Sequence, residues 1–205
     1  MAYTPYFPAI AVGSLAWGVP LNTALANLDR VQESKATDQG LINWNFSPGT
    51  NLVSTAITSG TVSMAKVWIR QPVTVNSVAV GIGTVGAALV AGQNFAGLYD
   101  AGGNRLGQTA DQTAAWGTIG GKNMALTAPV VISTPGAYYV AILSNAGTTP
   151  AFARGSALTP SVANINLTAT DGAWTTGPAG QTTLPVSITM AARSLTGNAL
   201  WVAVG

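Results

Sequence analysis

The chain has 205 residues, of which 7% are charged and 48% are hydrophobic, and its formal net charge is +2. A typical soluble domain carries about 25% charged residues, so a surface this rich in Thr, Ser, Gly and Asn suits a subunit of a larger assembly. Cysteine and histidine are absent and the eight cations are scattered, which excludes disulfides, Cys–His metal sites and His-based catalysis and argues against nucleic-acid binding.

The first segment, residues 1–19, is predicted to be an extended docking arm. Pro5 and Pro8 interrupt any regular element there, and the segment carries four aromatic residues: Tyr3, Tyr6, Phe7 and Trp17. Aromatic side chains in an extended segment usually pack on another surface, so we expect this arm to dock on a partner. The segment is a poor signal peptide because it lacks a cationic start, and no apolar run in the chain reaches the ~18 residues of a membrane span.

Residues 20–36 are predicted to form one short amphipathic helix. Pro20 suits the first helical turn, and apolar residues fill the a and d positions of two heptads: Leu21, Ala24, Leu28 and Val31, with Leu25 widening the seam. Two interpretations stay open. The helix either packs on its own domain or self-associates on the axis of a trimer, and in the second case a larger domain must share the stabilisation because two heptads are marginal alone.

After a linker at residues 34–40, residues 41–205 read as strands and turns and are predicted to form the main domain. In "KVWIR", Val67 and Ile69 fall on one face of a strand, and the other face carries Lys66, Trp68 and Arg70. In "PVTVNSVAVGI" the alternation slips by one residue at Asn76 and Ser77, which predicts a β-bulge. The absence of helical patterns indicates an all-β, antiparallel sandwich, for which we prefer jelly-roll connectivity, although periodicity alone does not separate it from other Greek keys.

Residues Gly81–Gly86 read "GIGTVG", which matches the glycine pattern of dinucleotide-binding sites. That site needs a following helix whose N-terminus holds the pyrophosphate, and here only "AALVAGQNFA", cut by Gly92, precedes the next strand. We therefore expect these glycines to relax a bulged strand, and we expect no cofactor.

Few side chains are suited to catalysis. Outside the helix and linker the acids are Asp100, Asp111 and Asp171, each in a turn sequence where Asp bonds its own backbone, so we expect neither a catalytic set nor a metal site.

Binding of a ligand is more plausible than catalysis, because Trp116 and Trp174 lie in Gly/Thr-rich loops. With Asp171 they are candidate glycan contacts, although either ring can instead plug one end of the sandwich. The remaining tryptophans of the domain are predicted to be packing or subunit-interface residues: Trp44, Trp68 and Trp201.

Two blocks of the sequence resemble structural proteins of tailed bacteriophages, particularly those that infect actinobacteria. "WGVPLNTALANLDRVQ" is similar to the short helix that opens many tail-fibre and minor tail proteins. The second block resembles a domain repeated in such proteins and consists of "KVWIRQPVTVNSVAVGI", "FAGLYDAGGNRLGQTAD", "AYYVAILSN" and "PAFARGS". Together the blocks cover most of residues 17–156. The resemblance implies a trimer whose N-terminal region attaches to the particle while the β domain projects outward, and it brings no active site or ligand residues.

The sequence thus predicts a non-enzymatic virion protein on the outer surface of a phage, namely a trimeric tail-fibre or minor tail component that contacts the host cell. The expected partners are further copies of the chain, other virion proteins through the arm, and a host cell-surface glycan, with no nucleic acid and no membrane insertion. Two alternatives stay open. One is a capsid decoration protein or head fibre at a threefold site, and the other is a stand-alone carbohydrate-binding β-sandwich module.

Overall fold

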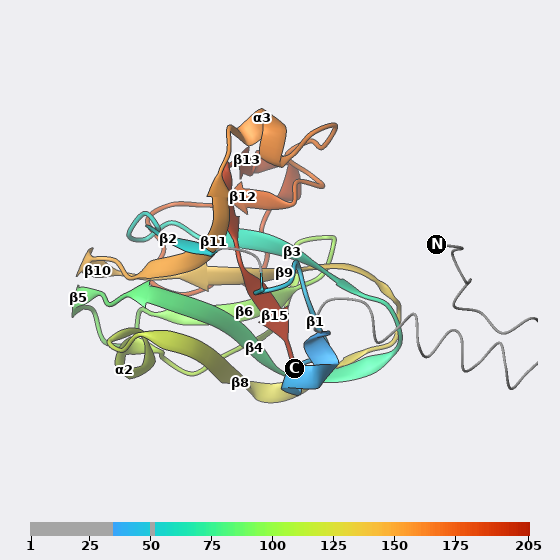
Figure 1. Cartoon of the computed structure of the whole chain (residues 1–205), viewed down its shortest axis with the longest axis horizontal. Helices are drawn as coiled ribbons and strands as arrows, with labels where there is room; N and C mark the ends of the chain where they lie inside the picture. Colours follow the sequence, from blue (N-terminus) through green and yellow to red (C-terminus); the bar gives the residue numbers. More distant parts are fainter. Residues whose placement is uncertain (1–34, 50–51) are drawn as a thin grey trace, which may run out of the picture. The chain divides into compact units, whose positions relative to one another are not determined.

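The computed structural model of the protein describes residues 35–49 and 52–205, and Ala36–Gly205 form one compact unit (Figure 1). The docking arm and the amphipathic helix stay predictions, because their candidate contact residues lie outside the described residues: Tyr3, Tyr6, Phe7 and Trp17 in the arm, and Leu21, Ala24, Leu25, Leu28 and Val31 in the helix. Within the described part of the chain, no helix is both long and apolar enough to cross a membrane.

The compact unit begins within the segment that was predicted to be a linker. Ala36–Gln39 form a 3-10 helix, η1, and Ala36 is buried against Leu41 and Trp201. Burial of these apolar side chains fixes the segment on the sheet, so it is part of the fold.

The pairing of the strands gives two antiparallel sheets in jelly-roll order, which confirms the predicted all-β sandwich. One sheet contains the neighbours β2 (Val53–Ala56), β11 (Ala151–Ala157), β4 (Val73–Thr84) and β8 (Gly120–Ile132). The other contains β3 (Ser63–Ile69), β9 (Gly136–Leu143), β6 (Phe95–Tyr99) and β7 (Arg105–Gln108). The chain crosses between the sheets after most of these strands, so each sheet is built from segments far apart in sequence.

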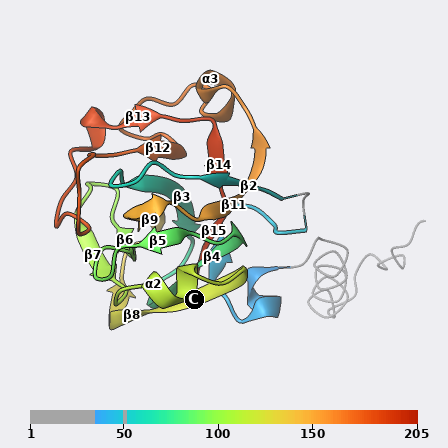
Figure 2. The same cartoon turned by 90° about the vertical axis from the view of Figure 1, so that its left-hand side faces the viewer.

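Shorter elements extend this frame. The first sheet gains β1 (Asn43–Trp44), β14 (Asn198–Leu200) and β15 (Val202–Val204), and the second gains β12 (Trp174–Thr176) and β13 (Ser194–Leu195). A separate pair consists of β5 (Ala87–Leu89) and β10 (Ala146–Thr148), and three single-turn helices are α2 (Thr113–Trp116), α3 (Pro160–Ala163) and η2 (Met190–Ala192). Figures 1 and 2 both place β12, β13 and α3 together at one end of the sandwich.

The predicted β-bulge is confirmed. The register of β4 against β8 shifts between Val75 and Ser77. The backbone N–H groups of Asn76 and Ser77 both donate to the Gly205 carbonyl, at 2.6 and 2.8 Å. One acceptor thus satisfies the two donors that a bulge turns to the same side of the strand.

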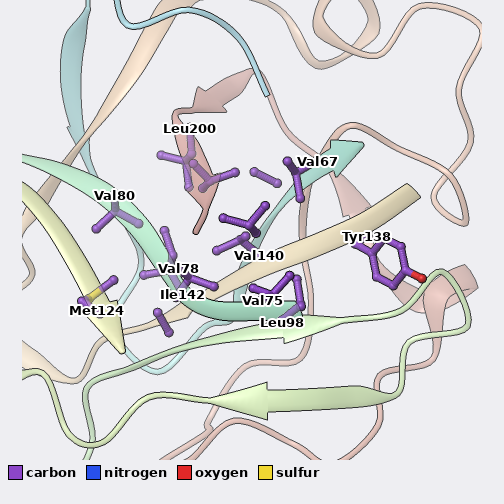
Figure 3. Close-up of a cluster of buried hydrophobic side chains, with 14 of the residues drawn as sticks. Val67, Val75, Val78, Val80, Leu98, Met124, Tyr138, Val140, Ile142 and Leu200 are labelled. Carbon is purple, nitrogen blue, oxygen red and sulfur yellow. The ribbon is translucent and has the colours of Figure 1, made fainter. Parts of the chain in front are cut away.

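The main core lies between the two sheets (Figure 3) and follows the alternation of their strands. Val67 and Ile69 of β3 are fully buried there, while Trp68 on the opposite face is exposed, as predicted. Two smaller clusters cover the outer faces. One joins Tyr139 and neighbours on the second sheet to Leu184, Ile188 and Met190 of the C-terminal segment, and the other lies under η1.

Candidate functional site

An open groove lies where the edge of β3 faces β1. β12 pairs with β3 only from Ser63 to Ala65, and the Lys66 N–H then donates to the Ala173 carbonyl, so no described strand pairs with this edge beyond Lys66. Instead the Asn43 amide of β1 donates to the Trp68 carbonyl at 2.6 Å. The groove, which we call the β1–β3 groove, measures about 350 Å³ and is lined by Asn43, Trp44, Asn45, Phe46, Lys66, Trp68, Arg70, Ala173 and Trp174.

The aromatic side chains give this groove a fixed wall and an exposed indole. The indole N–H of Trp174 donates to the Leu200 carbonyl at 3.2 Å, and the Trp174 ring meets the Phe46 ring edge to face with centroids 6.5 Å apart. Trp68 is different, because 52% of its surface is exposed. The groove thus offers a large aromatic face to solvent beside rings that are held in place.

The two asparagines of the groove mainly hold β1 against the body of the domain. The Asn45 amide donates to the Leu200 carbonyl at 2.7 Å, and its oxygen accepts from the Phe46 and Val202 N–H groups, both at 3.1 Å. These bonds use Asn45 structurally, so the charged donors that the groove offers to a ligand belong to Lys66 and Arg70.

Lys66 sits at the inner end of the groove. Its ammonium donates to the Asp171 carbonyl and lies 5.9 Å from the centroid of the Tyr139 ring. Burial lowers the pKa of Lys66; the Asp171 carboxylate opposes this shift and the nearby Arg193 adds to it. Since no carboxylate lines the groove, its electrostatic character is cationic.

The three candidate glycan contacts fare differently. The prediction that Trp116 contacts a glycan is wrong. Its side chain is 0% exposed in the main core and meets Phe152 edge to face, with ring centroids 5.2 Å apart. The ring therefore fills the interior, where no sugar can reach it. Trp174 lines the groove. The Asp171 carboxylate does not line it, because it accepts from the N–H and O–H of Thr168 at 2.7 and 2.8 Å; only its backbone carbonyl touches the site, through Lys66.

Sequence reasoning missed most of the groove. Trp44 and Trp68 were assigned to packing or subunit contact; Trp44 does pack partly against the cluster under η1, but both line the groove. Trp201 is a packing residue: its side chain is 8% exposed, and its indole N–H donates to the Phe46 carbonyl at 3.0 Å. One sequence pattern could have indicated the groove: Lys-x-Trp-x-Arg places two cations and an indole on the polar face of a strand, in a chain with only eight cations.

Of the other two aspartates outside the predicted helix and linker, Asp100 bonds locally, as predicted, whereas Asp111 also bonds to a segment distant in sequence. Asp100 accepts from the backbone and side chain of Asn104 at 2.8 and 2.9 Å. Asp111 accepts from the Asn94 N–H at 3.1 Å; burial would raise its pKa, but hydrogen bonds from Thr113, Gly92 and Asn94 together hold it below its ordinary value. Among the described residues, no three His, Cys, Asp or Glu side chains gather as metal ligands.

Comparison with known protein families gives no match, and comparison with curated proteins gives none either.

Proposed function

We propose that this protein is a non-enzymatic binding module that contacts a cell surface by holding sugar rings in the β1–β3 groove. The observation that carries the proposal is the exposed indole of Trp68 in a groove whose other rings are fixed. An indole offers a flat apolar face to the C–H groups of a pyranose, while the N–H groups of Lys66 and Arg70 are donors for its hydroxyl oxygens.

The shape of the groove favours a saccharide over a small apolar ligand. Apolar ligands bind in enclosed pockets that cover most of their surface, whereas this groove is open along the β3 edge and carries two cations among its aromatic rings. A chain of sugar rings can lie along such a groove with one ring on Trp68 and its neighbours in solvent.

We further propose that the module works on the outside of a phage particle, as a trimeric tail-fibre or minor tail component. The support is the resemblance of residues 17–156 to such proteins, together with the jelly-roll order of the sheets. In this proposal the N-terminal arm attaches to other virion proteins and the β1–β3 groove contacts the host.

The test is the binding of soluble oligosaccharides by calorimetry, with Trp68→Ala against the unchanged protein. Burying one indole face contributes about 1.5–3 kcal/mol, so we expect Trp68→Ala to weaken binding at least about tenfold, while Trp68→Tyr retains most of it. Ile119→Ala is the matched control, because Ile119 is 67% exposed and lies outside the groove. The proposal fails if no neutral or charged oligosaccharide binds, or if Trp68→Ala binds as well as Ile119→Ala.

A further inference from the structure

The charged residues that line the β1–β3 groove are all basic. Two of the eight cations in the chain, Lys66 and Arg70, line it, and none of its nine lining residues is acidic. The closest acid that acts on the groove, Asp171, has its carboxylate bonded to Thr168. A neutral sugar does not need this excess of positive charge.

Arg70 differs from the other cations of the domain because it makes no hydrogen bond or ion pair with the described residues. Five other cations bond to carbonyl or side-chain oxygens: Lys66 to Asp171, Arg105 to Leu184, Lys122 to Thr118 and Ile119, Arg154 to Asn198, and Arg193 to Met190, Thr175 and Thr170. Arg70 is exposed and donates to no residue that the structure describes. Within residues 35–49 and 52–205, its guanidinium N–H groups are therefore available to a ligand.

The strand sets the spacing between these cations and the indole. Lys66 and Trp68 lie on the same face of β3, and Arg70 is the first residue after the strand. Consecutive members of this alternating set are about 7 Å apart along extended backbone. A pyranose stacked on Trp68 thus has a cation on either side along β3. A guanidinium binds carboxylate and phosphate oxygens through two parallel N–H bonds, which an ammonium cannot do.

From this juxtaposition we infer that the β1–β3 groove selects anionic saccharides, with the Arg70 guanidinium bound to the anion of a ring stacked on Trp68. The inference rests on the proposed function and names its ligand class. The shared chemistry is an oxyanion on a sugar, which is either the carboxylate of a uronic acid or a phosphate ester. Lys66, held by the Asp171 carbonyl, adds a second positive charge at the inner end of the groove.

The test uses ligand pairs that differ only in charge, measured by calorimetry on the full chain. Oligogalacturonate and its methyl ester probe a carboxylate, and phosphorylated dextran oligosaccharides and plain dextran oligosaccharides probe a phosphate. The variant is Arg70→Gln, and the matched control is Lys122→Gln, which removes the same charge outside the groove. Circular dichroism checks that both variants fold.

We expect the unchanged protein to prefer the charged member of at least one pair by about tenfold, as a charge-assisted hydrogen bond contributes. Arg70→Gln should remove that preference, because it weakens binding of the charged member about tenfold more than binding of the neutral member, while Lys122→Gln keeps the preference. A preference in only one pair identifies the source of the anion. Equal binding of charged and neutral members overturns the inference and leaves the proposed function standing, whereas absence of binding to all four ligands overturns the proposed function itself.

Discussion

The phenol of Tyr99 is the buried group that most directly links the stability of the domain to pH. Its side chain is 0% exposed in the cluster on the outer face of the second sheet, and its O–H donates to the Pro185 carbonyl at 2.6 Å. Burial raises the pKa of Tyr99 well above its ordinary value of 10.0, and the charge of Arg105 opposes this only in part. The folded protein therefore keeps a proton there that the unfolded chain releases.

This difference predicts a loss of stability at alkaline pH. A group with a raised pKa in the folded state contributes stability that is fully present below its unfolded pKa, near 10, and is lost as pH rises toward the folded pKa. Urea denaturation at pH 8 and pH 11 should show a smaller decrease in the free energy of unfolding for Tyr99→Phe than for the unchanged protein. At pH 8 the variant should itself be about 1 kcal/mol less stable, because the Pro185 carbonyl loses its donor. An identical decrease in both proteins would contradict the assignment to Tyr99.

At the scale of single residues, the sequence predicts which face of a regular strand a residue occupies, but it does not predict burial in loops. Trp68 lies on the predicted face of β3 because strict alternation fixes it. Trp116 lies in the four-residue helix α2, which is too short to show a period, so the sequence left open whether its ring contacts a glycan or plugs the sandwich. Its burial depends on Phe152, which is distant in sequence, and no local pattern contains that information.

At the scale of elements, β4 shows why glycine occurs twice at the end of a strand. A Cβ atom at Gly81 would lie 2.7 Å from the Ala153 Cβ, and one at Gly83 would lie 2.6 Å from the Ser54 Cβ. The "GIGTVG" pattern therefore permits β2 and β11 to approach β4 closely, and the chain continues into β5 rather than into a helix.

A matched pair of substitutions tests this close approach. Gly81 lies directly opposite Gly121 of β8, but no described atom lies within 4 Å of a Cβ at Gly121. Gly81→Ala should lower the free energy of unfolding by about 1–3 kcal/mol through overpacking, whereas Gly121→Ala should be neutral or stabilise by up to about 1 kcal/mol, because it restricts the unfolded chain. Chemical denaturation of both variants measures the difference, and equal effects would mean that β11 does not constrain Gly81.

The elements that the sequence predicts are the long ones. β3, β4 and the bulge at Asn76 and Ser77 follow from alternation within one segment. The short strands β12–β15 have only two or three residues each, and η1 has four, so tertiary pairing rather than local pattern defines them. The β1–β3 groove depends on such elements, since β1 forms one wall and the end of β12 leaves the β3 edge open. Its position could not be predicted for that reason.

At the scale of the whole molecule, low charge and exposed apolar side chains favour association. Only 7% of residues are charged, so electrostatic repulsion between copies is weak. Five aliphatic side chains of the described domain are more than half exposed: Ile119, Val131, Val162, Ile165 and Val186. Single exposed apolar residues are ordinary, so these five side chains are candidates for contact between copies of the chain and do not by themselves define an interface.

The mass of the protein in solution tests the proposed trimer and the role of the heptad seam together. Light scattering on the full chain should give three times the 20.7 kDa of one chain. Because two heptads bury little surface alone, charged side chains in the seam should be sufficient to separate the copies. The double substitution Leu21→Asp and Leu28→Asp should therefore give the mass of a monomer. A chain that begins at residue 36 should also be monomeric. Circular dichroism should show the β domain intact in both, because Ala36–Gly205 form their own compact unit. A trimer that survives both changes would move the contact to the β domain and its exposed aliphatic residues, whereas a monomeric full chain would remove the trimer and favour a single module that binds glycan by itself.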